Sequence, residues 1–199
     1  MSPANLAGVR AGYILAENGR SPLACRLRAE GAPLGEVFSF ISGLYFRGKL
    51  AYAQAFSAPP PVSAGSFVIT ACAGLITPET IVTLDRLREM AASDIDATNK
   101  LYRAPLDRDC RSLKKLAGNE CDVVLLGSIA TPKYVDPLLQ IFGERLAFPA
   151  EFVGRGDMSR GGLMLRCVTA KEELTYIPIL DASRRGAKPS KLSPLAGRK

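Results

Sequence analysis

Apolar residues gather in short runs that predict a set of buried strands. The clearest run is Cys121 to Leu126, and Phe67 to Cys72 is a second; both contain β-branched side chains. Such short apolar runs are typical of strands that are covered on both faces. Arg145 to Phe148 predicts a third short strand. Leu163 to Val168 and Leu174 to Ile179 predict two more strands, joined as a β-hairpin near the C-terminus.

Between these runs, apolar residues recur at helical spacing. From about residue 38 the chain predicts a helix with Tyr45, Lys49, Tyr52 and Phe56 on one face, and a run of three prolines ends it. Three further helices are predicted by the same spacing: Thr77 to about Met90, Pro105 to Gly118, and about Val135 to Phe142.

Near the N-terminus, Gly12 to Leu15 and Leu23 to Leu27 flank the turn-forming pair Asn18-Gly19, which predicts a β-ribbon. Gly31 to Gly35 and the glycine-rich stretch Gly154 to Gly162 are predicted to be loops. Strands that alternate with helices predict an α/β fold. We therefore expect a single-domain sandwich over residues 1–183, with a mainly parallel central sheet flanked by helices.

The positive charge is concentrated at the C-terminal end. The chain has 26 Lys and Arg against 19 Asp and Glu, a net charge of +7. Residues 184–199 hold six of these bases and no acid, so the body at 1–183 has a net charge of only +1. We expect this tail to be disordered. It could bind nucleic acid without reading sequence, or it could serve only as a solvated segment.

The composition excludes several kinds of chemistry. The chain has no histidine, which excludes Ser-His-Asp triads, Cys-His dyads and histidine-ligated metals. Its five cysteines are odd in number, and none are spaced as Cys-x-x-Cys. With no secretory signal and no apolar run of membrane-spanning length, we expect a cytoplasmic protein with free thiols that does not span a membrane. No metal site, cofactor or oligomeric state is indicated.

In open α/β sheets, ligands bind beyond the carboxyl ends of the strands. The loop from Gly127 to Tyr134 follows such a strand and resembles a phosphate-binding loop, since Gly127 and Lys133 have the right spacing. Pro132 replaces the second glycine and lacks the amide that would face phosphate, which argues against a nucleoside triphosphatase. A simpler anion or nucleotide contact remains open. Its candidate residues are Gly127, Ser128, Thr131, Lys133 and Tyr134.

The glycine-rich stretch at 154–162 is a second candidate binding segment. Its Arg155 and Arg160 could hold phosphate or carboxylate groups, with Ser159 beside them. Asp157 could act as a general base, orient an arginine or bind a metal. The alternative is a structural turn in which Asp157 pairs with Arg155 or Arg160.

Two other features have competing interpretations. Cys72 ends a predicted strand and could be a nucleophile, although a buried and inert thiol is the simpler interpretation. The face that carries Tyr45, Lys49 and Tyr52 could stack bases beside a phosphate track, or it could be part of the core.

Two segments carry a family resemblance. Val68 to Pro78 is similar to a strand-Ser-Ala-x-x-Gly-Leu-x-x-Pro pattern, and Val123 to Leu139 is similar to a strand-Gly-x-x-Tyr-x-x-Pro-Leu pattern. Both patterns occur in a bacterial α/β group that includes the YaaA-like peroxide-stress proteins and related uracil-DNA-glycosylase-like folds. The resemblance covers about a quarter of the chain. It implies an α/β fold and a nucleic-acid or nucleobase ligand, and it implies no catalytic residue here.

Three functions follow as hypotheses. The first is a protein that binds nucleic acid or a nucleotide through the loops at 127–134 and 155–160. The second is a histidine-independent enzyme that acts on a small anionic substrate, with Asp157 as base or Cys72 as nucleophile. The third is a non-catalytic interaction protein whose tail docks a partner.

Overall fold

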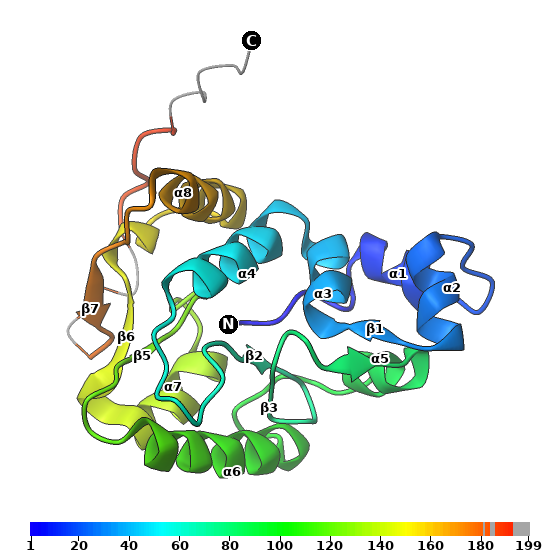
Figure 1. Cartoon of the computed structure of the whole chain (residues 1–199), viewed down its shortest axis with the longest axis horizontal. Helices are drawn as coiled ribbons and strands as arrows, with labels where there is room; N and C mark the ends of the chain where they lie inside the picture. Colours follow the sequence, from blue (N-terminus) through cyan, green and yellow to red (C-terminus); the bar gives the residue numbers. More distant parts are fainter. Residues whose placement is uncertain (181, 184–185, 193–199) are drawn as a thin grey trace.

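A computed structural model describes residues 1–180, 182–183 and 186–192 of the chain. In this part, helices and short strands fold around two hydrophobic clusters (Figure 1). The α-helices are α1 (Val9–Leu15), α2 (Pro22–Ala29), α3 (Leu34–Ser42), α4 (Leu44–Phe56), α5 (Leu84–Ala91), α6 (Lys100–Ala117), α7 (Pro132–Phe142) and α8 (Asp157–Ala170). The strands are β1 (Ala32–Pro33), β2 (Val68–Ile69), β3 (Leu75–Ile76), β4 (Ile81–Val82), β5 (Val123–Val124), β6 (Leu146–Pro149) and β7 (Tyr176–Pro178). Two short 3-10 helices, Gly143–Arg145 and Ala150–Phe152, flank β6.

The sheets are small and mostly antiparallel. β1 pairs with β4, β2 with β3 and β6 with β7 in antiparallel fashion, and β5 pairs with β6 in parallel. The predicted mixture of helices and strands is therefore confirmed, whereas the described residues do not form the predicted mainly parallel central sheet. One reason is visible after β2. There the Thr70 hydroxyl donates to the Gly74 carbonyl, 2.9 Å away, and the chain turns back to form β3.

The first two residues of the chain lie between β2 and the residues that follow β5. The Ile69 amide donates to the Met1 carbonyl over 2.9 Å, and the Ser2 amide donates to the Leu126 carbonyl over 3.1 Å. These bonds join the β2–β3 hairpin to the β5–β6–β7 sheet. Segments from the start and the middle of the sequence are therefore held side by side.

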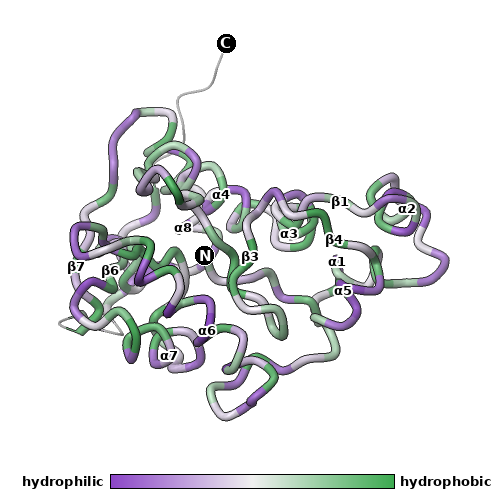
Figure 2. The backbone as a smooth tube through the Cα atoms, turned by 60° about the horizontal axis from the view of Figure 1, so that its bottom comes forward, coloured by the Kyte–Doolittle hydropathy of each residue, from purple (hydrophilic) through white to green (hydrophobic). Residues whose placement is uncertain are grey.

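The two hydrophobic clusters divide the molecule into two parts. The N-terminal cluster lies between α1, α2, α3 and α5, with Leu27, Phe38 and Leu87 at its centre. The main cluster lies between α4, α6, α7, α8 and β6, with Tyr102 and Phe148 fully or almost fully buried. Hydrophobic (green) and hydrophilic (purple) residues alternate along α6 and α7, as expected for helices with one buried face (Figure 2).

Helices α4 and α8 cross with their backbones in direct contact. A Cβ atom added at Gly48 would lie 2.6 Å from the Gly161 carbonyl oxygen, and one added at Gly161 would lie 2.6 Å from that of Leu44. The two backbones touch because neither position carries a side chain. α4 and α8 also pack more extensively than any other pair of described elements. The crossing fixes the start of α8 beside Tyr45.

The N-terminal β-ribbon prediction is wrong, since both of its segments are helices. Ser21 caps α2 by accepting a hydrogen bond from the Ala24 amide, and Pro22 occupies the first helical position. Both features favour a helix start, and they outweigh the turn signal of Asn18-Gly19.

The prediction for residues 154–168 is also wrong. Asp157 to Ala170 form one helix, α8, where a loop and a strand were expected. Consequently no hairpin closes the chain, and β7 reaches β6 after the helix. Glycines suggested a loop here, but Gly161 is needed for the crossing with α4.

Two helix boundaries also differ from the predictions. α5 begins at Leu84 because the Thr83 hydroxyl caps it, accepting from the Arg86 amide over 3.3 Å, while the residues before it form β4. α6 begins at Lys100, capped by Asn99, and Pro105 lies inside it.

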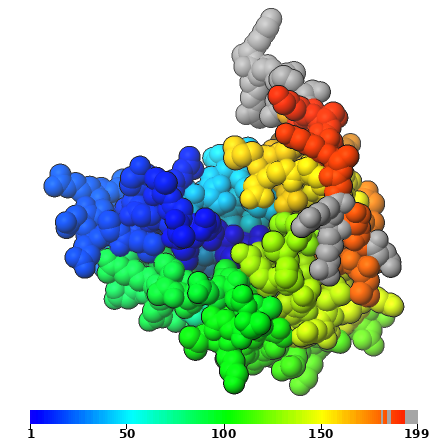
Figure 3. Space-filling model, turned by 180° about the vertical axis from the view of Figure 1, so that it is seen from behind, coloured from blue at the N-terminus to red at the C-terminus, as the bar shows by residue number. Residues whose placement is uncertain are grey.

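Part of the predicted disordered tail is described. Residues 186–187 lie beside Val153 and Gly154, and Leu192 lies near Gly162. In the space-filling view this segment (red) follows the surface at the opposite end from the N-terminal helices (blue) (Figure 3). The tail residues 184–185 and 193–199 lie outside the described residues. None of the described helices combines the length and the apolar character needed to cross a bilayer.

We predict that Gly161→Ala destabilises the fold by about 1–3 kcal/mol, because the added methyl group meets the backbone of α4, which cannot move aside cheaply. Gly162→Ala is the matched control, since its Cβ would find only the Leu192 side chain at 3.6 Å. The control should be neutral or up to about 1 kcal/mol more stable, as expected for replacing glycine inside a helix. Urea unfolding of both variants measures the difference. Equal stabilities would contradict the assigned crossing.

Candidate functional site

A polar cleft of about 980 Å³ lies between the two parts of the molecule. One wall comes from residues 2–7, the C-terminal end of α5 and the loop that leads into α6. The opposite wall comes from the starts of α7 and α8, and Tyr45 of α4 and Thr70 after β2 also line the cleft. Its volume lies within the range of about 300–1,000 Å³ that small-molecule sites occupy.

The N-termini of two helices reach this cleft. α7 follows β5 and α8 follows β6, and these two strands are the parallel pair of the sheet. Neither helix has a side-chain cap: Thr131 and Gly156 occupy the N-cap positions and make no such hydrogen bond. Pro132 has no amide hydrogen, so α7 offers the amides of Lys133 and Tyr134, while α8 offers those of its first turn, and the helix dipole favours an anionic ligand.

The structure brings the two predicted binding segments together. Ser128, Thr131, Lys133 and Tyr134 from the first segment and Asp157 from the second all line the cleft. The Lys133 Nζ atom lies 5.1 Å from the centre of the Tyr134 ring. Burial raises the pKa of Tyr134 to about 12, so this phenol stays protonated at neutral pH.

Three other predicted residues, Arg155, Ser159 and Arg160, make contacts within their own segment and with the residues just before it. Arg155 donates to the Glu151 carbonyl over 2.9 Å and to the Ser159 hydroxyl over 3.2 Å. Arg160 donates to the Phe152 carbonyl, and its guanidinium lies 3.5 Å from an Asp157 oxygen. Asp157 therefore pairs with Arg160, as the structural alternative expected, but the pair lies in the first turn of α8 and not in a loop turn. These bonds hold the loop before α8 in place.

Gly127 and Cys72 lie just outside the cleft lining. Gly127 is buried, and a Cβ atom there would lie 3.0 Å from the Ser2 side chain. Cys72 is partly buried against the N-terminal cluster, whereas its neighbours Thr70 and Ala71 line the cleft. Gly127 thus shapes the loop by allowing the close approach of residue 2.

Tyr45 is the most telling residue of the cleft. Its side chain is 6% exposed, and among the described residues no group makes a hydrogen bond of good geometry with its hydroxyl. Burial raises the pKa of Tyr45, and weaker hydrogen bonding from the Arg160 and Ser2 side chains opposes that rise, so the contact of these two side chains with the hydroxyl is only partial. A buried hydroxyl without a partner costs about 1–3 kcal/mol, so its retention points to a ligand that supplies the bond. The sequence showed Tyr45 as part of an aromatic and basic face but did not indicate this unpaired hydroxyl.

Lys49 lies one helical turn from Tyr45 and is fully buried. Its ammonium donates to the carbonyl oxygen and the hydroxyl of Ser2, at 2.6 and 3.0 Å, and sits 4.3 Å from the centre of the Tyr45 ring. Burial lowers the pKa of Lys49 to about 7; Asp157 acts against this shift and Arg160 adds to it. Lys49 therefore fixes residue 2 at the base of the cleft.

The acidic wall of the cleft was missed by sequence reasoning. Asp94, Asp96, Thr98 and Asn99 line it from the loop between α5 and α6. Asp96 accepts bonds from the amide and hydroxyl of Thr98, and the Asn99 side chain donates to the Asp94 carbonyl. The only available signal was the density of Asp, Thr and Asn in a short loop. Among the described residues, no group of three or more Cys, Asp or Glu side chains could hold a metal ion.

We predict that Lys49 makes stability depend on pH. Its pKa is about 7 in the folded state and 10.5 ordinarily, so between these values the unfolded chain binds more protons. The free energy of unfolding should therefore rise with pH across this window, by up to about 1.4 kcal/mol per pH unit, and Lys49→Met should lose that rise. Urea unfolding between neutral pH and pH 10 measures it, with exposed Lys115→Met as control. Parallel curves for wild type and Lys49→Met would refute the assignment.

Comparison of the chain with known proteins gave no match among protein-family models, curated proteins or solved structures.

Proposed function

We propose that this protein binds a mononucleotide, or a phosphorylated ligand of similar size, in the polar cleft. The observation that carries the proposal is the convergence of two uncapped helix N-termini on a cleft that also contains an unpaired buried hydroxyl. The first sequence-based hypothesis offered nucleic acid or a nucleotide as the ligand. The present proposal takes the nucleotide and names the residues that would bind it.

The start of α7 is the proposed phosphate site. Ser128, Thr131 and Lys133 supply two hydroxyls and an ammonium around the free amides of the helix. Such a set matches the oxygens and the charge of a phosphate group. The position is also the one where open α/β folds bind ligands, beyond the carboxyl end of a strand in a parallel pair.

The acidic wall of the cleft provides hydrogen-bond acceptors for the sugar hydroxyls of a mononucleotide. Carboxylates such as those of Asp94 and Asp157 accept hydrogen bonds from neutral hydroxyl groups, and Asn99 can both donate and accept. The Tyr45 hydroxyl would gain its missing partner from the sugar or the base. A ligand with one anionic end and several hydroxyls therefore satisfies both walls.

The charges argue against a polynucleotide in this cleft. Asp94, Asp96 and Asp157 line it, and Lys133 is the one basic side chain that lines it within the part of the chain that the structure describes. A chain of phosphates would meet three carboxylates, whereas binding to nucleic acid relies on several phosphates being neutralised by lysine and arginine. A single phosphate at the start of α7 avoids this repulsion.

Calorimetric titration with nucleoside monophosphates, the matching nucleosides and an oligonucleotide tests the proposal. We predict that the monophosphate binds more tightly than both other ligands. Lys133→Met should weaken monophosphate binding by at least about tenfold, because a hydrogen bond to a charged group contributes about 1.5–3 kcal/mol. Lys115→Met is the control, since Lys115 is exposed on α6 and does not line the cleft. Tighter binding of the oligonucleotide, or no effect of Lys133→Met, would contradict the proposal.

Tyr45→Phe should have opposite effects on stability and binding. Removing a buried hydroxyl that has no partner should leave the free protein equally stable or stabilise it by up to about 3 kcal/mol, while weakening monophosphate binding. Tyr52→Phe is the matched control, because its hydroxyl accepts from the Leu174 amide over 2.8 Å and is 2.8 Å from the Tyr176 hydroxyl. That variant should lose about 1 kcal/mol and bind normally. If Tyr45→Phe binds the monophosphate like wild type, the hydroxyl has no role in the site.

A further inference from the structure

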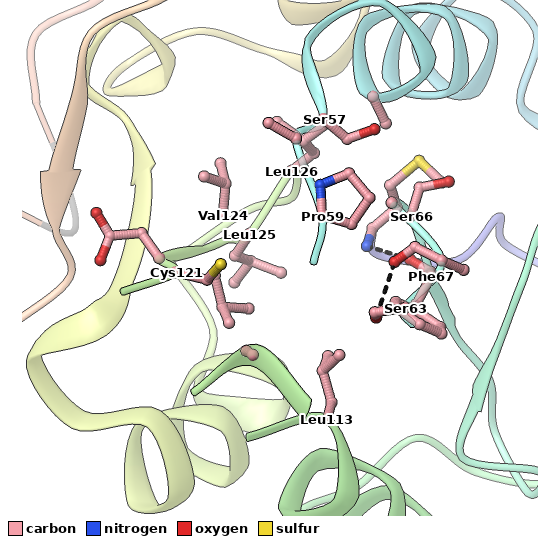
Figure 4. A pocket seen from close by; sticks show the side chains of 18 of the residues that line it. Ser57, Pro59, Ser63, Ser66, Phe67, Leu113, Cys121, Val124, Leu125 and Leu126 are labelled. Carbon is pink, nitrogen blue, oxygen red and sulfur yellow. Dashed lines mark hydrogen bonds between the residues drawn. The ribbon is translucent and has the colours of Figure 1, made fainter. Parts of the chain in front are cut away.

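A second pocket lies inside the main cluster, away from the polar cleft. It has a volume of about 380 Å³ and is covered by the loop between α4 and β2. In Figure 4, Ser57, Pro59, Ser63 and Phe67 of this loop face the residues of β5 and its flanks across the pocket, and Leu113 of α6 closes another side. An apolar cavity of about 150 Å³ already holds benzene, so this pocket has room for a ring with a short chain.

The inner surface of the pocket is apolar. Phe56, Leu125 and Phe142 line it, and each belongs to the main cluster or packs against it. Such a surface gains free energy when it is covered by an apolar ligand, because both surfaces leave water. The covering loop is rich in Pro, Ser, Ala and Gly, and its Ser63 amide bonds to the Pro60 carbonyl within the same loop.

The mouth of the pocket is acidic. Glu120, Asp122 and Glu173 line it and are exposed, and no Lys or Arg of the described chain lines it. Glu173 also accepts a hydrogen bond of 2.7 Å from the Tyr176 hydroxyl, which fixes its carboxylate beside the pocket. The Met1 nitrogen donates to the Phe67 carbonyl at the pocket wall, and burial lowers the pKa of this amino group to about 5, so it is uncharged at neutral pH.

We propose that this pocket binds an apolar ligand that carries a positively charged amine, with the apolar part inside the cluster and the amine at the three carboxylates. Apolar anions such as acyl carboxylates fit the cavity equally well but meet three like charges at its mouth. Charge at the mouth therefore sets the class of ligand, while the cavity sets its size. The proposal is independent of nucleotide binding, because none of the described residues lines both pockets.

Three probes that share a phenylethyl group and differ in charge test the proposal: phenethylamine, phenethyl alcohol and hydrocinnamate. Calorimetric titration at neutral pH and low salt should show the amine binding at least about fivefold more tightly than the alcohol, with the carboxylate weakest. The double variant Glu120→Gln/Asp122→Asn should lose about fivefold in amine affinity, the scale of two exposed ion pairs, and keep its alcohol affinity. Glu144→Gln, an exposed carboxylate outside the pocket, is the control and should change neither.

A second variant tests the location. Ala53 lines the pocket from α4, and Ala53→Leu should fill part of it and abolish binding of both amine and alcohol. Circular dichroism and thermal unfolding verify that Ala53→Leu folds. If it does not fold, the double variant Glu120→Gln/Asp122→Asn still tests the proposal. The proposal is overturned if phenethylamine fails to bind, if hydrocinnamate binds as tightly as phenethylamine, or if folded Ala53→Leu binds the amine like wild type.

Discussion

The crossing of α4 and α8 at Gly48 and Gly161 is the contact on which the cleft depends. Because the two backbones touch, the start of α8 is held beside Tyr45, and Asp157 and Arg160 meet the face of α4 that carries Lys49. A side chain at either glycine would meet the backbone of the other helix, so the crossing could not keep its present spacing. The crossing therefore links the packing of the main cluster to the geometry of the site.

The distribution of charge follows from that geometry. Lys49 is buried at the base of the cleft and donates its hydrogen bonds to Ser2, while Arg160 donates to the Phe152 carbonyl and forms an ion pair with Asp157. Two basic groups thus hold the scaffold, which leaves Lys133 and the amides at the start of α7 to meet an anion. The net charge of +7 gives no hint of this, since the surface of the cleft carries more acids than bases.

The sequence predicted the parts of the fold that depend on local pattern. Strand β6, helix α7 and the end of α4 at the prolines were found because their apolar spacing and breakers are local. Helix α8 was missed because its glycines serve a contact with α4, about 110 residues earlier in the chain, and a single sequence does not reveal that contact. For the same reason, the sequence indicated the loops at 127–134 and 155–160 as separate candidates. Their convergence on one cleft with Tyr45 and Asp94 depends on tertiary packing, which a single sequence does not reveal.

The most direct test of the central claim is the location of the bound phosphate. Amide chemical shifts of the full chain, recorded during titration with a nucleoside monophosphate, should change at Thr131, Lys133 and Tyr134 and at Asp157 to Ser159, the starts of α7 and α8. The corresponding nucleoside should leave the amides at the start of α7 nearly unchanged. Shifts confined to residues 186–192, or equal shifts with nucleoside and monophosphate, would contradict the assignment of the phosphate site.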